Sequence, residues 1–312
     1  MNLVRLYGLV VDSDVDLHGA GEPVSDVEPD VVVTLGVPFV APEAFPAGCT
    51  LLDFETTDPW YTLVQEPDGA YIFRIHSLCD FEIDAELRNV VVRMQEGVAP
   101  DMAGVLVTGA LLSALLYLRG VHVFHGSAVE FRGRAVGFVG HSGQGKSTLA
   151  TLFCSEGASA ITDDVLVIDR GDVVTVRKGS PELRLRPGAR DLVSRMTDAD
   201  TRVSVDDRYV VMPASAQDTS IPLAAIVIPR PSKDGEEIHY EHLSQRDAML
   251  ALLAYPRLMG WSDDAVLKNA FSEIAALVAR VPVFIGDIPW GPPFPEGLAV
   301  ALESAIAETD GA

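Results

Sequence analysis

The chain has 312 residues, of which 48% are hydrophobic, and it carries a formal net charge of −22 at pH 7. A chain of this length and apolar content can bury a sizeable core, in one large domain or two smaller ones, which excludes a disordered protein. The strong negative charge argues against nucleic acid or an anionic membrane as a partner, because both attract basic surfaces.

The cysteine usage favours a cytoplasmic protein. Cys49, Cys79 and Cys154 lie far apart, and such an odd and sparse set suits a reducing compartment better than a disulfide scaffold or a metal site. The first residues lack the charged and then apolar build of a signal peptide. The longest apolar run, 103–118, is short for a bilayer, so we expect a buried core helix there.

Residues 1–99 are expected to form a β-rich N-terminal domain. Short runs of strand composition are separated by clusters of Gly, Pro and Asp, which favour turns. These runs are 3–11, 30–35, 71–76 and 89–94. No helical period is sustained there, so we predict a boundary near residue 99 and a second domain over 100–312.

The second domain is expected to begin with the buried helix and to continue with mixed strands and helices. Strands are predicted at 123–131, 135–139, 161–168, 173–177, 209–212 and 223–228. Helices are predicted at 148–155, 244–255, 263–281 and 296–307. This alternation indicates an α/β fold.

The two strands at 123–131 and 135–139 are predicted to form a hairpin. If the turn centres on Gly133, His125 lies opposite His141, at the end of the sheet where the next loop begins. An antiparallel strand at this place argues for a mixed rather than a purely parallel sheet. His125 titrates in the physiological range and suits phosphoryl chemistry, whereas a hydrogen-bonded strand-end histidine is the alternative. His141 is expected to fill space.

The segment 140–148 reads Gly-His-Ser-Gly-Gln-Gly-Lys-Ser-Thr and fits the pattern G-x-x-x-x-G-K-[ST]. It follows an apolar strand and opens a helix, so backbone N–H groups and the helix dipole can face one anion. We expect a phosphate-binding loop (P-loop) in which Lys146 reaches the β- and γ-phosphates of ATP and Ser147 can ligate Mg²⁺. The residues expected to bind the nucleotide are Gly140, Ser142, Gly143, Gly145, Lys146, Ser147 and Thr148. An incidental glycine-rich turn is the alternative interpretation.

Two adjacent carboxylates, Asp163 and Asp164, follow the loop after one predicted helix. Neighbouring carboxylates are costly unless a cation or a proton lies between them. Phosphoryl transfer uses both, because one can hold Mg²⁺ while the other accepts the proton of an attacking hydroxyl. An Asp-rich turn in an acidic chain is the alternative.

Three segments, 125–129 (HGSAV), 140–148 (GHSGQGKST) and 161–165 (ITDDV), occur in an order and spacing that resemble the HPr kinase/phosphorylase family. They are more similar to its relatives that phosphorylate ribosomal peptides such as lasso peptides. The resemblance covers roughly residues 119–230. It implies a mixed α/β fold, similar to that of phosphoenolpyruvate carboxykinase, and ATP and Mg²⁺ as cofactors.

The resemblance also implies roles for single residues. His125 would pair with Asp163, and Asp163 would be the base toward a serine hydroxyl, with Lys146 as the third catalytic residue. Ser147 and Asp164 would hold Mg²⁺. The stretch 181–184 (PELR) loosely resembles the family's L-E-I-R segment and would make Glu182 a further metal ligand and Arg184 a phosphate or structural contact. An ordinary strand is the alternative there.

The chain departs from HPr kinases proper in two places. The glycine-rich signature that serves phosphorolysis is not recognisable at 185–188, so we do not expect dephosphorylation or HPr as the substrate. The first 99 residues do not resemble the N-terminal domain of HPr kinases. Their S-D-x-x-L opening at 13–17 is similar to that of the peptide-modifying relatives.

These features together predict a phosphotransferase, an ATP- and Mg²⁺-dependent kinase. The favoured acceptor is a serine or threonine hydroxyl of a peptide, such as a ribosomally made natural-product precursor. A kinase of a small-molecule hydroxyl and a nucleotide-binding regulatory or scaffolding protein are the alternatives. A protein that only binds nucleotide needs no base beside the γ-phosphate, which argues against the last. The acceptor, the number of metal ions and assembly into a homo-oligomer are left open by the sequence.

Overall fold

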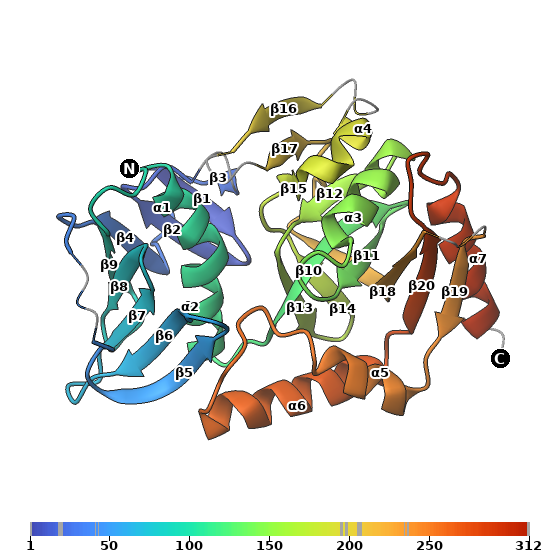
Figure 1. Cartoon of the computed structure of the whole chain (residues 1–312). Coiled ribbons are helices and arrows are strands. Elements are labelled where there is room, and N and C mark those ends of the chain that lie inside the picture. Colours follow the sequence, from blue (N-terminus) through green and yellow to red (C-terminus); the bar gives the residue numbers. More distant parts are fainter. Residues whose placement is uncertain are drawn as a thin grey trace. The chain divides into compact units, whose positions relative to one another are not determined.

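The computed structural model of the chain describes residues 2–17, 21–40, 42, 44–193, 196, 199–204, 208–233, 235 and 237–310. The protein is a mixed α/β protein that divides into two compact units (Figure 1). The first comprises Met1–Val121 with Leu258–Asn269, and the second comprises His122–Arg257 with Ala270–Ala312. Residues 100–121, which the sequence pattern groups with the second part, therefore belong to the first unit.

The first unit is built on one mixed sheet. Within the described residues its nine strands follow the order β3-β1-β2-β4-β9-β8-β7-β6-β5. Their bounds are β1 Asn2–Leu6, β2 Leu9–Ser13, β3 Glu22–Pro23, β4 Val31–Leu35, β5 Cys49–Glu55, β6 Pro59–Gln65, β7 Tyr71–Ile75, β8 Cys79–Ile83 and β9 Asn89–Met94. The run 3–11, expected as one strand, is split by a turn at Tyr7 and Gly8, where φ is 55° and 82°. The sequence pattern does not predict β3, β5, β6 or β8.

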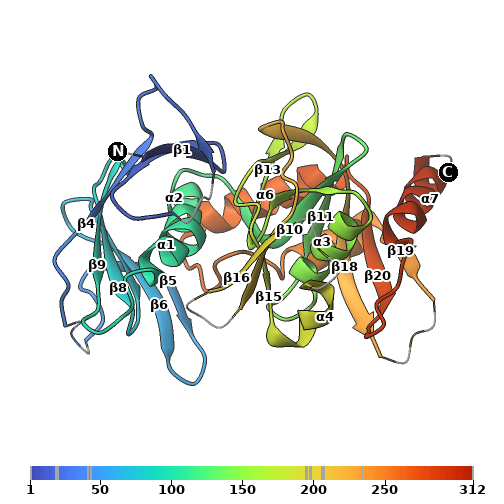
Figure 2. The ribbon, with the colours of Figure 1, turned by 90° about the horizontal axis from the view of Figure 1, so that it is seen from above.

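A helical segment lies against one face of this sheet (Figures 1 and 2). It consists of α1 (Met102–Leu106), a π-helical turn η1 (Val107–Leu111) and α2 (Leu112–Leu118), and it is largely buried, as expected for 103–118. Its hydroxyls are satisfied within the helix, since Thr108 and Ser113 donate to the carbonyls four residues earlier at 2.9 and 2.6 Å. Among the described residues, no helix is long and apolar enough to cross a membrane.

The second unit contains a sheet that closes partly on itself. The strand order is β11-β10-β13-β14-β18-β20-β19; in addition, β11 pairs with β18 and β12 pairs with β10. The bounds are β10 Val123–Phe131, β11 Arg134–Val139, β12 Ser159–Thr162, β13 Val165–Arg170, β14 Val174–Arg177, β18 Ser220–Ser232, β19 His239–His242 and β20 Val283–Pro289. Strands β11, β18 and β20 are parallel, so their carboxyl ends share one edge. Ligands commonly bind at such an edge.

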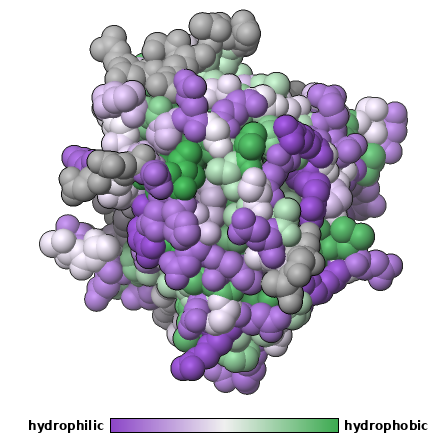
Figure 3. Space-filling view, turned by 90° about the vertical axis from the view of Figure 1, so that its right-hand side faces the viewer, coloured by the Kyte–Doolittle hydropathy of each residue, from purple (hydrophilic) through white to green (hydrophobic). Residues whose placement is uncertain are grey.

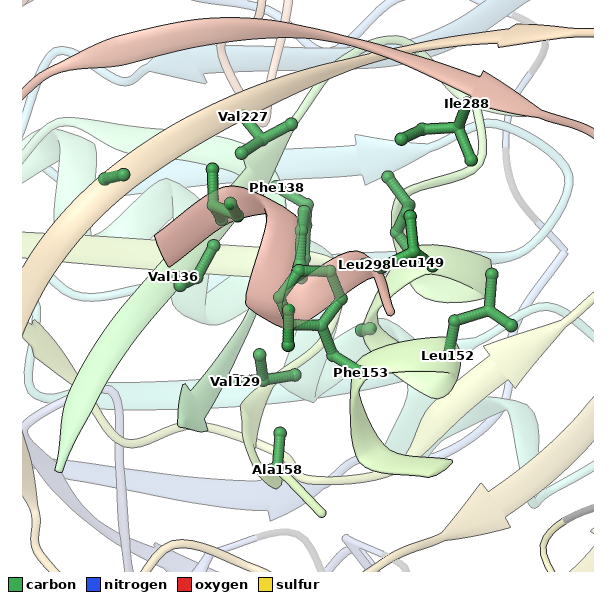
Figure 4. Close-up of a cluster of buried hydrophobic side chains, with 14 of the residues drawn as sticks. Val129, Val136, Phe138, Leu149, Leu152, Phe153, Ala158, Val227, Ile288 and Leu298 are labelled. Carbon is green, nitrogen blue, oxygen red and sulfur yellow. The ribbon is translucent and has the colours of Figure 1, made fainter. Parts of the chain in front are cut away.

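Helices cover this sheet and bury two clusters of apolar side chains. The helices are α3 Lys146–Ser155, α4 Arg190–Val193, α5 Gln245–Leu252, α6 Asp264–Val278, which begins in the first unit, and α7 Leu298–Asp310. One cluster joins α3 and α7 to β11, where the rings of Phe138 and Phe153 meet at 5.0 Å (Figure 4). The neighbouring Val139 belongs to the other cluster, with α5 and α6, because successive strand residues face opposite sides.

A small antiparallel sheet lies beside α3. Its order is β15-β17-β16, with bounds β15 Leu183–Leu185, β16 Asp200–Val203 and β17 Tyr209–Met212. The short 3-10 turn η2 (Pro187–Ala189) follows β15. On the face of the molecule shown in Figure 3, hydrophilic side chains predominate and hydrophobic ones form separate spots, as expected for so acidic a chain.

Candidate functional site

The predicted hairpin is present and carries the loop 140–148. Strands β10 and β11 are joined by a two-residue turn at Arg132 and Gly133, both at positive φ (52° and 77°), the combination that suits the twist of a hairpin. The turn occupies two residues and is not centred on Gly133 alone. His125 therefore stands opposite Gly140, whose N–H donates to the His125 carbonyl at 3.3 Å, and not opposite His141.

The loop runs from Gly140, directly after β11, into the first turn of α3, which holds Lys146, Ser147 and Thr148. Gly143 and Gly145 have φ of 84° and 94°, a backbone that other residues adopt only with strain. The expected nucleotide-binding residues thus lie on one strand–loop–helix unit.

Gln144 holds the loop in shape from within. Its Oε1 accepts from the His141 N–H at 2.8 Å, and its Nε2 donates to the Pro229 carbonyl of β18 at 2.9 Å. These bonds tie the loop to the neighbouring parallel strand.

Lys146 folds back along the loop. Its Nζ donates to the His141 carbonyl at 2.9 Å, and its side chain is buried. Burial lowers the pKa of Lys146 to about 8, although Asp164 and Asp163 act in the opposite direction. The ammonium is therefore still the main form at pH 7.

The run 161–168, expected as one strand, is two strands separated by the aspartate pair. β12 and β13 both pair with β10, and the Val165 N–H donates to the Asp163 carbonyl at 2.8 Å, which makes a three-residue turn. Asp164 at the centre of that turn has a φ of 68°. Such a γ-turn is rare and strained for a residue with a side chain. It gives the two carboxylates different surroundings.

Asp163 is buried against Ser147, in the first turn of α3. Its Oδ1 accepts from Ser147 Oγ at 2.9 Å and from Ser127 Oγ at 2.5 Å, and its Oδ2 accepts from the Arg184 N–H at 2.9 Å. The residue as a whole is only 5% exposed. Three donors from three different elements thus fix its orientation.

Asp164 is more exposed than Asp163, since its side chain is 41% exposed, and its carboxylate contacts Arg257 and His125. Arg257 Nη2 donates to its Oδ2 at 2.6 Å, and His125 Nε2 lies 3.2 Å from its Oδ1. Although burial alone would raise it, Arg257 and then His125 hold the pKa of Asp164 well below its usual range. Burial, together with Lys146 and Arg257, lowers the pKa of His125 although Asp164 acts in the opposite direction, so the ring is mainly neutral at pH 7.

This arrangement corrects the pairing that the resemblance implied. His125 contacts Asp164 and not Asp163, while Asp163 contacts Ser147. The reason lies in β10, where His125 and Ser127 share a face. His125 pairs with Val165, directly after Asp164, and Ser127 reaches back to Asp163.

The expected metal ligands Ser147, Asp164 and Glu182 do not contact one another in the described structure. Ser147 donates to Asp163, and buried Glu182 forms an ion pair with Arg202. Within the described ranges, no group of three or more His, Cys, Asp or Glu residues could hold a metal ion. Because Mg²⁺ keeps several waters and binds substrate phosphates, it needs only one or two protein ligands, and the paired oxygens of Ser147 and Asp163 suit it.

Three polar residues of the site were not identified from the sequence. Ser127 could have been predicted, because it lies two residues after His125 and therefore on the same face of the strand. No sequence pattern near Arg257 points to the site, because it is 93 residues from Asp164. Its segment is held beside β10 by two backbone hydrogen bonds. The His125 N–H donates to the Tyr255 carbonyl, and the Arg257 N–H donates to the Val123 carbonyl. Arg186 donates to Ser142 Oγ at 3.1 Å.

Comparisons with known proteins give a distant likeness to solved structures. No protein-family model matches the chain, and no curated protein matches it. Among solved structures, the Hpr(Ser) kinase/phosphatase from Coxiella burnetii aligns with 60% of this chain and 98% of its own, at 10% identity and a TM-score of 0.33. The relationship is structural and remote.

Proposed function

We propose that the protein is an ATP- and Mg²⁺-dependent kinase that transfers the γ-phosphoryl group to a hydroxyl. The observation that carries this proposal is that the two adjacent aspartates have different contacts. Asp163 is buried against the P-loop serine, while Asp164 is turned outward by a strained backbone and held by His125 and Arg257. A site that only binds nucleotide has no use for the second, strained carboxylate.

The triphosphate would lie along residues 140–148, with backbone N–H groups and Lys146 facing the phosphate oxygens. Ser147 and Asp163 would hold Mg²⁺, which neutralises charge on the β- and γ-phosphates. Asp163 thereby takes the metal-binding role and Asp164 the role of base, the reverse of the roles that the resemblance implied. Glu182, through its pair with Arg202, would position β15.

In the transfer step, the acceptor oxygen forms a bond to the γ-phosphorus while the bond from that phosphorus to the β–γ bridging oxygen breaks, releasing ADP. The hydroxyl proton passes to the Asp164 carboxylate. A carboxylate with so low a pKa is a weak base, so it acts mainly by orienting the hydroxyl, and the proton moves late in a loose transition state. His125 and Arg257 keep its two oxygens in place.

The acceptor we propose is a serine or threonine hydroxyl of a peptide in the cytoplasm, such as a natural-product precursor. The resemblance of residues 13–17 to peptide-modifying kinases supports it. In the structure Ser13 Oγ accepts from the Val15 N–H at 3.0 Å, and Val15 and Leu17 are buried, so this segment helps to shape the first unit.

An acceptor panel tests the proposal. Purified protein receives γ-labelled ATP and Mg²⁺ with serine- and threonine-containing peptides, HPr or small alcohols, with Lys146→Ala as the control for contaminating kinases. Label on a peptide that is absent with Lys146→Ala supports the full proposal. Label only on a small alcohol supports a metabolite kinase, and tight ATP binding without transfer to any acceptor supports a regulatory nucleotide-binding protein.

A further inference from the structure

Arg186 lies beside the P-loop because β15 is anchored to the site. The N–H of Arg184 in β15 donates to Asp163 Oδ2 at 2.9 Å, which fixes the strand against the aspartate. The next residues bring the Arg186 guanidinium over the loop, where Nη2 donates to Ser142 Oγ at 3.1 Å. A methyl group added at Gly143 would lie 3.2 Å from Arg186 Nη1. The guanidinium therefore packs directly on the Ser142–Gly143 part of the loop.

In the part of the chain that the structure describes, no carboxylate neutralises the charge of Arg186. Its side chain is exposed. The chain has 45 acidic and 23 basic residues, and other arginines near the site do pair, Arg202 with Glu182 and Arg257 with Asp164. An uncompensated guanidinium held on a phosphate-binding loop favours an anion from outside the chain.

We infer that Arg186 contacts the γ-phosphate of bound ATP and makes the site discriminate between ATP and ADP. This inference rests on the proposed function, since it takes the loop to bind a nucleotide. The N–H groups of the loop and Lys146 serve the phosphates from the loop itself, whereas Arg186 approaches from another element, as an arginine supplied within the same chain does in some phosphoryl-transfer enzymes. The planar guanidinium can donate to two phosphate oxygens at once.

Arg186 would act twice in the reaction. In the ground state it binds a phosphate that ADP lacks. In the transition state negative charge spreads over the oxygens of the transferred group, and a fixed guanidinium stabilises that charge without reorganisation. Both effects depend on the positive charge and on the forked geometry. Arg186→Lys keeps the positive charge but not the forked geometry.

The test compares ATP and ADP affinity in the wild-type chain, Arg186→Ala and Arg186→Lys, by calorimetric titration with Mg²⁺. Arg134→Ala is the matched control, because Arg134 is an exposed arginine at the start of β11, the end of the strand away from the loop. We expect Arg186→Ala to lose roughly 10- to 100-fold in ATP affinity, while ADP affinity changes less than about twofold. Arg186→Lys should lose less ATP affinity than Arg186→Ala, and the control Arg134→Ala should lose none.

Unchanged ADP affinity also shows that the variant is folded. If Arg186→Ala keeps the wild-type preference for ATP over ADP, the inference about Arg186 is wrong while the proposed kinase function stands. Equal affinity of the wild-type chain for ATP and ADP would also overturn it. If the wild-type chain binds neither nucleotide, both the inference and the proposed function fail.

Discussion

Asp164 combines a positive backbone φ with a pKa held well below its usual range. Aspartate tolerates positive φ better than most side chains, yet the γ-turn that holds it at 68° is still strained. The turn moves its carboxylate away from Asp163 and toward His125 and Arg257. Two like charges that are adjacent in sequence thus acquire separate partners, which removes the cost expected for neighbouring carboxylates.

Lys146 provides a pH-dependent test at the scale of one residue. Its pKa of about 8 in the free protein is lowered chiefly by burial, and only the protonated form attracts phosphate. ATP affinity should therefore be constant between pH 6.5 and 7.5 and should fall by roughly tenfold for each pH unit above 8. Calorimetric titration across this range measures it. An affinity that stays flat to pH 9.5 would show that the Lys146 ammonium does not contribute to binding.

At the scale of elements, β10 organises the site because it pairs with β11, β12 and β13. Gly126 is central to this arrangement: a methyl group there would lie 2.9 Å from both the Phe138 carbonyl oxygen and Leu166 Cδ2. The strands can approach this closely only without a side chain at this position. The same approach places His125 and Ser127 beside the aspartate pair.

We expect Gly126→Ala to destabilise the protein by about 1–3 kcal/mol, because a backbone oxygen cannot move aside as a flexible side chain would. Thermal unfolding should show this as a drop of roughly 2–4 °C for each kcal/mol. Gly188→Ala is the control, since a methyl group there meets no heavy atom of the described residues within 4 Å. Equal melting temperatures for the two variants would contradict the close approach at β10.

How much of these elements is predictable from sequence depends on the range of the interactions. The hairpin and the loop 140–148 are encoded locally, by turn residues and glycines, and both are found. The break between β12 and β13 was missed, because the apolar run around Asp163 and Asp164 has the composition of one strand. The break arises from pairing with β10, where β12 and β13 take different stretches of the same strand. The contact of Arg257 with Asp164 depends likewise on tertiary structure.

For the whole molecule, buried histidines make stability sensitive to acid. Burial lowers the pKa of His122 to about 4, against 6.5 when the chain is unfolded. Between these values the unfolded chain binds more protons than the folded chain, so stability is lost as the pH falls. The loss from His122 is roughly 3 kcal/mol between pH 6.5 and pH 4.

Denaturant unfolding of His122→Phe at a series of pH values tests this effect. The variant should lose less stability than the wild-type chain on acidification, with a reduced rather than abolished slope, because burial also lowers the pKa of His76 and His125. The two proteins should be compared by the change with pH and not by absolute stability. Parallel curves for the two proteins would contradict the assignment.

The central claim, that this site transfers a phosphoryl group with Asp163 on the metal and Asp164 on the acceptor, is tested most directly by asparagine substitutions. Asparagine keeps the size of aspartate and tolerates the positive φ of residue 164. The measurement is Mg²⁺·ATP affinity and single-turnover transfer, to the acceptor identified in the panel, for Asp163→Asn and Asp164→Asn across a Mg²⁺ titration.

We expect Asp164→Asn to bind Mg²⁺·ATP within about threefold of the wild-type chain and to lose roughly 10²- to 10⁴-fold in transfer. Asp163→Asn should need much more Mg²⁺ for the same ATP affinity. The opposite pattern would mean that the roles are those implied by the resemblance. Transfer at a near wild-type rate by Asp164→Asn would contradict the account of this site.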